Sequence, residues 1–252
     1  MDTNPEDQWD AHWDTYGAAL LANPANAYRD DLVLRALGDV PPGSVLVDFG
    51  AGQGELALVL AEQLSNPKVI GLEASTIGVA RAQHAAAASG SPARFVVADL
   101  LKDQGSPSTN ASFGICSEVL EHVDDPVVLL RNAAAHLASG ARLIVTVPGG
   151  IRTAFDRHIG HRAHFDAPRL RGVLEEAGYT HIEVDRAGFP FFNLYKFLIA
   201  AQGQGLVNRL KRSPEAPSKL QKLGSSIFSR LFSLNLPQSP FGWQLVATAV
   251  RP

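Results

Sequence analysis

The 252-residue sequence has a single cysteine, Cys116, and no long apolar run. One cysteine excludes a disulfide framework and any cysteine-based zinc or iron–sulfur cluster. The best candidate for a membrane span, FPFFNLYKFLIAA, is shorter than the roughly 18 apolar residues that a spanning helix requires. The sequence begins MDTNPEDQWD and lacks the basic and apolar regions of a signal peptide. We therefore expect a soluble, reduced, cytoplasmic protein.

The sequence also lacks an excess of positive charge. Its formal net charge is −3 at pH 7, which argues against a protein that binds nucleic acid through a general basic surface. Hydrophobic residues make up 46% of the chain and charged residues 19%, so a sizeable core can form and wholesale disorder is excluded. The length fits one α/β domain, or one such domain with a helical insertion.

Short apolar runs alternate with helical patterns along the chain, which predicts a parallel sheet with helices on both faces. A helix is expected to begin at Pro126, with Asp125 as its N-cap, and to be ended by Gly140. In such sheets a ligand binds at the carboxyl ends of the strands. The expected strands are 45–49, 68–72, 94–98, 113–117, 142–147, 180–185 and 243–250, and the other helices are 53–64, 76–89 and 168–177.

Two segments lie outside this pattern. Residues 1–40 predict a helical cap over one edge of the crevice, and residues 190–236 are inserted before the last strand. The insertion is rich in aromatic residues and has seven Lys or Arg against one acidic residue, a net charge of +6. We therefore divide the chain into a cap (1–40), a core (41–189), the insertion (190–236) and a last strand that completes the core (237–252).

The sharpest motif is DFGAGQG at residues 48–54, between the first strand and the first helix. Glycines there allow backbone to approach a ligand closely. The spacing is G-x-G-x-G, not the G-x-G-x-x-G of a dinucleotide site, which places a pyrophosphate at the helix N-terminus. Asp48 precedes the first glycine by two residues. Its charge would disfavour a pyrophosphate and favour a cationic ammonium or sulfonium ligand.

Polar or acidic side chains also end the next three strands. Glu73 ends the second strand, Asp99 the third, and Ser117 with Glu118 the fourth. The number of residues between Asp48 and Glu73 is close to the usual spacing between a glycine-loop motif and the acid that accepts hydrogen bonds from ribose hydroxyls. Asp99 can accept a hydrogen bond from an adenine amino group. Any one of these acids alone would be interpreted as a helix cap. Four successive strand ends of this kind favour a nucleotide-binding crevice.

The motifs VLVDFGAGQGE, VIGLEAS, VVADL, SEVLEHVDDP and GARLIVTVPGG occur in this order. Together they resemble the class I S-adenosylmethionine-dependent methyltransferases, in detail over residues 45–178. Within this family, the sequence is more similar to the ubiquinone-type and natural-product branch than to the DNA amino-methyltransferases. The DNA enzymes have an Asn/Asp-Pro-Pro-aromatic motif at the fourth strand, and the segment CSEVL of this sequence does not match it. The resemblance implies a Rossmann-like sheet of seven strands, the last antiparallel, and S-adenosylmethionine as the cofactor.

The resemblance also implies roles for individual residues. The glycine loop and Asp48 would hold the methionyl part of the cofactor, Glu73 the ribose, and Asp99 with the Leu100 amide the adenine. Tyr16 and Arg29 lie in the segment that closes over the cofactor in related enzymes, and an arginine suits a carboxylate; ordinary helix packing explains Tyr16 equally well. The full expected set is Tyr16, Arg29, Asp48, Gly50, Ala51, Gly52, Gln53, Glu73, Ala74, Asp99, Leu100, Ser117 and Glu118.

Histidines are the candidate general bases, because a hydroxyl nucleophile loses its proton as it attacks and the histidine pKa suits that transfer. His122 follows the fourth strand, and His158, His161 and His164 repeat at every third residue after the fifth. His122 and His161 are the leading candidates, followed by His158. The alternative is that these rings hydrogen-bond loop backbone or structure a lid.

A metal site is the rival interpretation of the same segment. Glu118, Glu121 and His122 with a later histidine would form a carboxylate–imidazole site, an arrangement similar to that of the metal-dependent small-RNA 2′-O-methyltransferases. However, the EVLEHV motif also occurs in metal-independent relatives, and the sequence has no obvious RNA-binding surface. We predict no bound metal.

The predicted function is therefore methyl transfer to a small hydrophobic metabolite of secondary metabolism, without a nucleic-acid partner. Oxygen is the preferred acceptor atom, and nitrogen and carbon are the alternatives. The insertion at 190–236 would cover the acceptor as a lid. Its other interpretations are a basic amphipathic surface that makes weak membrane contact or forms a homodimer, and a helical hairpin that completes the core. A non-catalytic protein that only binds S-adenosylmethionine is the alternative from another class.

Overall fold

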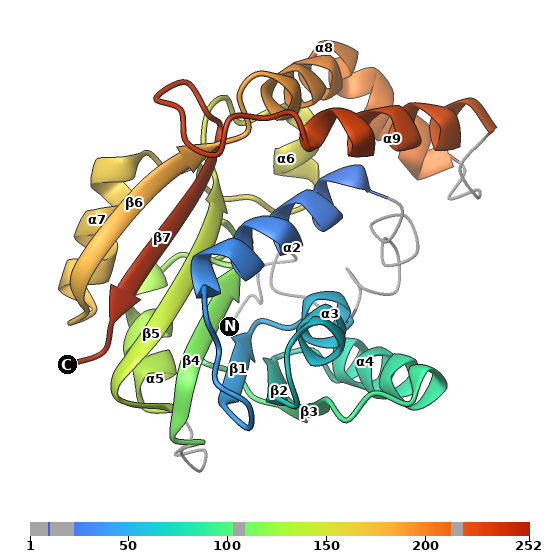
Figure 1. Ribbon diagram of the computed structural model, residues 1–252. Coiled ribbons are helices and arrows are strands. Elements are labelled where there is room, and N and C mark those ends of the chain that lie inside the picture. Colours follow the sequence, from blue (N-terminus) through green and yellow to red (C-terminus); the bar gives the residue numbers. More distant parts are fainter. Residues whose placement is uncertain (1–9, 11–22, 103–108, 213–218) are drawn as a thin grey trace, which may run out of the picture.

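The computed structural model describes residues 10, 23–102, 109–212 and 219–252, and the side chains of these residues outside 206–222. In this part of the chain seven strands form one sheet in the order β3-β2-β1-β4-β5-β7-β6 (Figure 1). The strands are β1 (Val45–Phe49), β2 (Lys68–Glu73), β3 (Arg94–Val97), β4 (Ala111–Ser117), β5 (Leu137–Pro148), β6 (Thr180–Ala187) and β7 (Gln244–Val250). β7 is antiparallel to β5 and β6, and the other pairs are parallel. This topology confirms the predicted Rossmann-like sheet.

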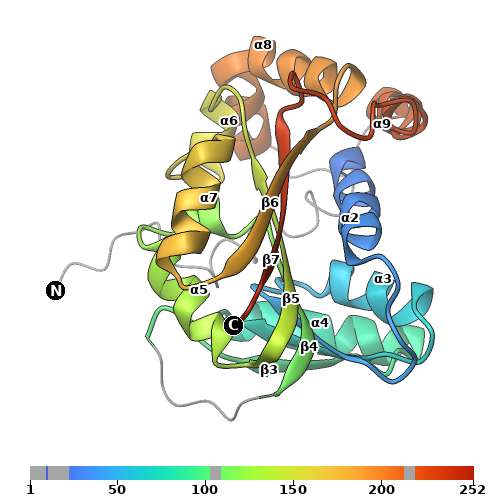
Figure 2. The same cartoon turned by 60° about the vertical axis from the view of Figure 1, so that its left-hand side comes forward.

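Helices cover both faces of the sheet (Figure 2). They are α2 (Pro24–Leu37), α3 (Glu55–Gln63), α4 (Thr76–Ser89), the 3-10 turn η2 (Leu120–His122), α5 (Pro126–Ala134), α6 (Ala154–His158), α7 (Ala167–Glu176), α8 (Phe191–Arg212) and α9 (Lys219–Phe232). α2, α3 and α4 pack on one face, and α5 and α7 on the other. Successive residues of β5 serve the two cores in turn, Val145 facing α5 and α7 and Ile144 facing α2 and α3.

The helix predicted to run to Gly140 is shorter than expected. Asp125 caps it by accepting from the Val128 N–H, as predicted, but the helix ends at Ala134. Gly140 lies within β5 instead, with φ +77°. It sits in the irregular stretch where the β4–β5 register shifts, so its left-handed backbone serves a strand irregularity and not a helix end.

The loop that carries three histidines contains a helix that the sequence pattern did not predict. α6 begins with a capping box, in which the Thr153 hydroxyl accepts from the Asp156 N–H and the Asp156 carboxylate accepts from the Thr153 N–H. At five residues α6 is too short to show helical periodicity. The capping box fixes the start of the segment that ends at His164.

The insertion packs on the N-terminal helix α2 through aromatic side chains. α8 and α9 lie over α2 in Figure 1, and Tyr28 of α2 contacts Phe192 and Phe232 at ring centroid distances of 5.2 and 5.4 Å. Phe192 and Phe232 are buried with Tyr28 in a third hydrophobic core. No helix in the described ranges is long and apolar enough to cross a membrane.

Two glycines test how closely the segment before β7 packs on the end of β6. An ideal Cβ at Gly242 would lie 2.3 Å from the Ala187 carbonyl oxygen, whereas a Cβ at Gly172, on the exposed side of α7, would meet nothing within 4 Å. We predict that Gly242→Ala lowers the free energy of unfolding by about 1–3 kcal/mol because backbone must move. The matched change Gly172→Ala raises it by about 0.5–1 kcal/mol, since alanine favours a helix interior. Urea denaturation measures both, and equal effects would contradict the packing.

Candidate functional site

The glycine loop of residues 50–54 lies at the carboxyl end of β1 and is fixed to its neighbours by backbone contacts. The N–H groups of Gly50 and Ala51 donate to the Leu72 carbonyl at 2.8 and 3.0 Å. Gly50 has φ +74°, and an ideal Cβ there would lie 2.6 Å from Cγ2 of Val119. The loop therefore packs directly against the chain that enters η2, and only glycine satisfies this position.

Glu73 faces the same loop. Its carboxylate accepts from the Gly52 N–H at 2.9 Å and from the Ser75 N–H at 2.8 Å. Burial raises the pKa of Glu73, while these N–H donors act to lower it. The structure thus brings Gly52 and Glu73 together, as the sequence predicts, and shows that Glu73 also holds the loop in shape.

Asp48 is buried beneath the loop among other acids. Burial is the main cause that raises its pKa to about 8, and the charges of Asp30, Glu73 and Glu55 add to the shift. Asp30 comes from α2, and burial likewise raises its pKa to about 6. These carboxyls create a negative potential that a cationic group would relieve.

The other predicted cofactor residues make contacts of different kinds with the protein. Asp99 accepts from the Leu101 N–H at 3.0 Å and pairs with Lys102 at 2.7 Å, so it contacts its own loop. The Leu100 carbonyl accepts from the Asn132 amide at 2.7 Å.

Gln53 is buried and accepts from Arg81 at 3.2 Å, whereas Ala74 is exposed. Tyr16 falls outside the described residues, so its predicted contact with the cofactor stays a prediction.

The Glu118 side chain contacts residues of α2, β5 and β7. It follows β4 with φ +57°, an uncommon conformation for a residue other than glycine. Its carboxylate pairs with Nε of Arg29 at 3.0 Å and accepts from Thr146 at 3.1 Å and from Gln244 at 2.7 Å. The Ser117 hydroxyl lies 2.8 Å from the Thr146 hydroxyl. The predicted residues Arg29 and Glu118 therefore contact each other and join α2 to the ends of β4, β5 and β7.

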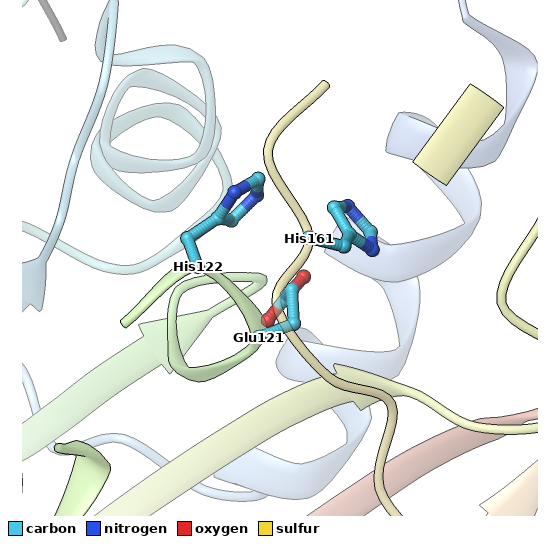
Figure 3. A group of neighbouring side chains, drawn as sticks. All are labelled: Glu121, His122 and His161. Atoms are coloured by element: carbon cyan, nitrogen blue, oxygen red, sulfur yellow. The ribbon is translucent and has the colours of Figure 1, made fainter. Parts of the chain in front are cut away.

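Two histidines and one acid lie close together (Figure 3), and the acid, Glu121, is near the charges of this junction. Glu121 and His122 come from η2 and His161 from the loop after α6, and one potential ligand atom from each lies within 4.8 Å of the others. The rings of His122 and His161 meet edge to face at a centroid distance of 4.6 Å. Glu121 is fully buried, and burial with the nearby charge of Glu118 raises its pKa well above its usual range.

His161 is linked through His164 to the backbone carbonyl of Gly150. Its Nδ1 lies 3.2 Å from Nε2 of His164, and Nδ1 of His164 lies 3.3 Å from the Gly150 carbonyl. Burial lowers the pKa of His161 well below its ordinary value, and neighbouring positive groups lower it further. Burial also lowers the pKa of His164. Both rings are therefore uncharged near pH 7.

Asp156 and Lys196 complete the cluster. The Asp156 carboxylate lies 3.7 Å from Nε2 of His164 and accepts from the Lys196 ammonium at 3.0 Å. Neither group of potential ligand side chains found in the described part of the chain includes His158, which ends α6. Its predicted catalytic role stays a prediction.

Sequence reasoning missed three charged residues of this region: Asp30, Asp156 and Lys196. The T-x-x-D capping pattern at Thr153 is a local signal that could have identified Asp156. Lys196 follows Asp156 by 40 residues, on the inserted helix α8, and has no local signal.

Comparison with known proteins places the chain among methyltransferases. The sequence model of a family described as "Methyltransferase domain" matches residues 21–184. Among curated proteins, the "Ubiquinone biosynthesis O-methyltransferase" of Xylella fastidiosa (strain 9a5c) is 31% identical over 145 residues, which is 57% of this chain. The chain spans 56% of the length of that relative.

Solved structures show the same fold at lower identity. Phosphoethanolamine N-methyltransferase 2 of Haemonchus contortus, in complex with S-adenosyl-L-methionine, has a TM-score of 0.60 and 17% identity, covering 89% of this chain and 52% of that one. Geranyl diphosphate methyltransferase, in complex with GPP and sinefungin, has a TM-score of 0.57 and 18% identity, covering 90% and 78%.

The buried carboxyl of Asp48 gives stability a specific pH dependence. Its pKa is about 8 in the folded chain against an ordinary value of 3.8, so between these values the folded state binds the proton more strongly than the unfolded state. Its contribution to the unfolding free energy therefore falls as pH rises from about 4 to about 8. We predict that Asp48→Asn removes this loss, so that the variant gains on the wild type by up to about 1.4 kcal/mol per pH unit.

Urea denaturation at intervals from pH 5 to 9 measures the effect. Glu62→Gln, at an exposed position of α3, is the matched control and keeps the wild-type pH profile. Parallel profiles for Asp48→Asn and the wild type would show that Asp48 is ionised in the folded chain and would contradict the prediction.

Proposed function

Because the chain belongs to the methyltransferase-domain family and is a class I S-adenosylmethionine-dependent methyltransferase, we propose that it methylates a hydroxyl oxygen of a small, hydrophobic acceptor. The observation that carries the proposal is the buried pair of uncharged rings, His161 and His164, beside the junction of Arg29 and Glu118. Such a ring is a proton acceptor shielded from water, which a hydroxyl nucleophile requires.

The residues around the glycine loop fit S-adenosylmethionine. The three glycines of the loop present backbone without side chains, and the acids Asp48, Asp30 and Glu73 favour a ligand with a positive charge. We propose that Asp48 and the loop hold the methionyl part, Glu73 the ribose, and Asp99 with Leu100 the adenine. When bound, the cofactor supplies an electrophilic methyl group on sulfur.

We assign the general base to His161, with His122 facing it. Burial keeps the His161 ring neutral, so that it can take the acceptor proton as the oxygen attacks. Exclusion of water also favours a transfer in which opposite charges cancel. Contact of Val119 with the glycine loop places η2, and therefore His122, next to the proposed cofactor site.

The acceptor is proposed to be small and hydrophobic because of what covers the site. α8 joins α2 and α9 through aromatic rings, and its Lys196 reaches Asp156 beside the histidines. We propose that this insertion is the acceptor lid. The curated relative is by name an O-methyltransferase of ubiquinone biosynthesis, and one solved relative holds GPP, which agrees with an apolar acceptor.

Removal of the Glu73 charge tests the cofactor site. We predict that Glu73→Gln weakens binding of S-adenosylhomocysteine by about 1–3 kcal/mol, roughly 5- to 150-fold, because a charged acceptor is lost. Calorimetric titration measures the affinity, with the exposed Glu62→Gln as control. An affinity equal to that of the wild type would refute the placement of Glu73 at the ribose.

The acceptor class and the base can be tested together. Release of S-adenosylhomocysteine is measured with apolar phenols and catechols and with amines of matched size, and we expect turnover with hydroxyl acceptors. His161→Gln lowers kcat by about 100-fold or more and leaves cofactor affinity unchanged. His84→Gln, at an exposed position of α4, is the control. Turnover of amines alone, or a wild-type rate for His161→Gln, would contradict the proposal.

A bound divalent cation is the alternative at the same cluster, favoured by the proximity of Glu121, His122 and His161. Against it, Glu118 of the predicted ligand set is held by Arg29, Thr146 and Gln244. We predict that dialysis against a chelator leaves turnover within about twofold of the untreated enzyme, since the base is an imidazole. Loss of activity that Mg²⁺ or Zn²⁺ restores would favour the metal-dependent function instead.

A further inference from the structure

We infer that the Gly150 carbonyl, through His164, fixes the tautomer of His161, so that the His161 proton lies on Nδ1 and its lone pair on Nε2. Asp156 and Lys196 act as positioning residues for this chain of contacts. The inference rests on the proposed function for its catalytic meaning, but the tautomer itself follows from hydrogen-bond geometry.

The Gly150 carbonyl determines which ring nitrogens donate and which accept in the hydrogen bonds from His161 to His164 and on to Gly150. A backbone carbonyl can only accept, so Nδ1 of His164, 3.3 Å from the Gly150 oxygen, must carry a proton. In a neutral imidazole the other nitrogen then has no proton, and Nε2 of His164 is an acceptor. His161 Nδ1, 3.2 Å from that nitrogen, must therefore be the donor. The lone pair of His161 is left on Nε2.

The outer end of the chain is itself held rigidly. The Asp156 carboxylate accepts from the Thr153 N–H at 2.7 Å and from the Lys196 ammonium at 3.0 Å, and only 1% of Asp156 is exposed. The same carboxylate lies 3.7 Å from Nε2 of His164. Because Lys196 belongs to α8, the insertion is coupled through Asp156 to the ring that orients His161.

The charges that face the two rings favour a proton on His164 over one on His161. Asp156 of α6 and Glu118 after β4 act on His164 as negative charges, whereas Arg29 of α2 and Lys196 of α8 act on His161 as positive charges. The same Lys196 also faces His164, and His122 faces His161. Glu121 lies in one group with His122 and His161, and burial raises its pKa well above the usual range. The Coulomb interaction with Asp156 therefore stabilises a cation at His164.

The proton balance follows from this arrangement. The acceptor O–H bond breaks and its proton forms a bond to His161 Nε2, while the oxygen keeps the electron pair for its new bond to the methyl carbon. The bond between that carbon and the sulfur of S-adenosylmethionine breaks, and the sulfur keeps its electron pair in the S-adenosylhomocysteine that is released. The proton on His161 Nδ1 then passes to His164 Nε2. His161 ends neutral with its proton on Nε2, and His164 ends as a cation beside Asp156, from which the proton is later lost to water.

Nuclear magnetic resonance of the chain labelled with ¹⁵N-histidine, saturated with S-adenosylhomocysteine, tests the tautomer without any acceptor. We expect His161 as the pure Nδ1–H form and the exposed control His84 as the mixture of a solvated imidazole. In His164→Phe, which removes the acceptor nitrogen, His161 loses this fixed state. An Nε2–H form of His161 in the wild type would overturn the inference.

Kinetics test the positioning residues with the best hydroxyl acceptor of the panel. We expect Lys196→Met and Asp156→Asn to lower kcat roughly 10- to 100-fold with KM changed less than threefold, and Lys196→Arg to restore most of the rate. Lys196→Met also tests the coupling if Asp156→Asn does not fold. Wild-type kcat in Lys196→Met would overturn the positioning role. A fixed Nδ1–H tautomer together with an active His161→Gln would instead contradict the proposed base alone.

Discussion

The burial of Asp48 among other carboxyl groups is the constraint on which the rest of the site depends. Asp48 lies beneath the glycine loop with Asp30, Glu55 and Glu73 as its charged neighbours, and each of these four acids has a raised pKa because of burial. A protein has no stability reason to gather acids in this way. The arrangement is favourable once a cation binds, and it explains why the glycine loop, β2 and α2 all converge on one point.

The second feature is the coupling of the insertion to this point. Aromatic packing of Phe192 and Phe232 on Tyr28 fixes α8 and α9 to α2, and α2 carries both Asp30 and Arg29. The Lys196–Asp156 pair makes a second connection, on the side of the histidines. The helices that we propose to cover the acceptor therefore pack on the helix that carries Asp30 on one side and pair with Asp156, a neighbour of His164, on the other. A substitution in the aromatic packing on α2 or at the Lys196–Asp156 pair would therefore affect both the acids and the histidines.

Local patterns predicted the sheet and the glycine loop well, because a buried strand or a capped helix is encoded by adjacent residues. β1 and α4 have the predicted bounds, and Asp125 caps α5 as expected. The patterns failed where a residue's partner is distant. Gly140 serves a strand irregularity that only the β4 pairing creates, and neither Asp30 near Asp48 nor Lys196 on Asp156 has a signal in its own neighbourhood.

The most direct test of the account is calorimetric titration with S-adenosylmethionine at pH 7 in buffers of different ionisation enthalpy. A cation beside Asp48 lowers its pKa from about 8, so binding must release protons at this pH. The account predicts binding with proton release in the wild type, and a much smaller release for Asp48→Asn. Binding without proton release, or no binding by the folded chain, would contradict the claim that these acids form the cofactor site.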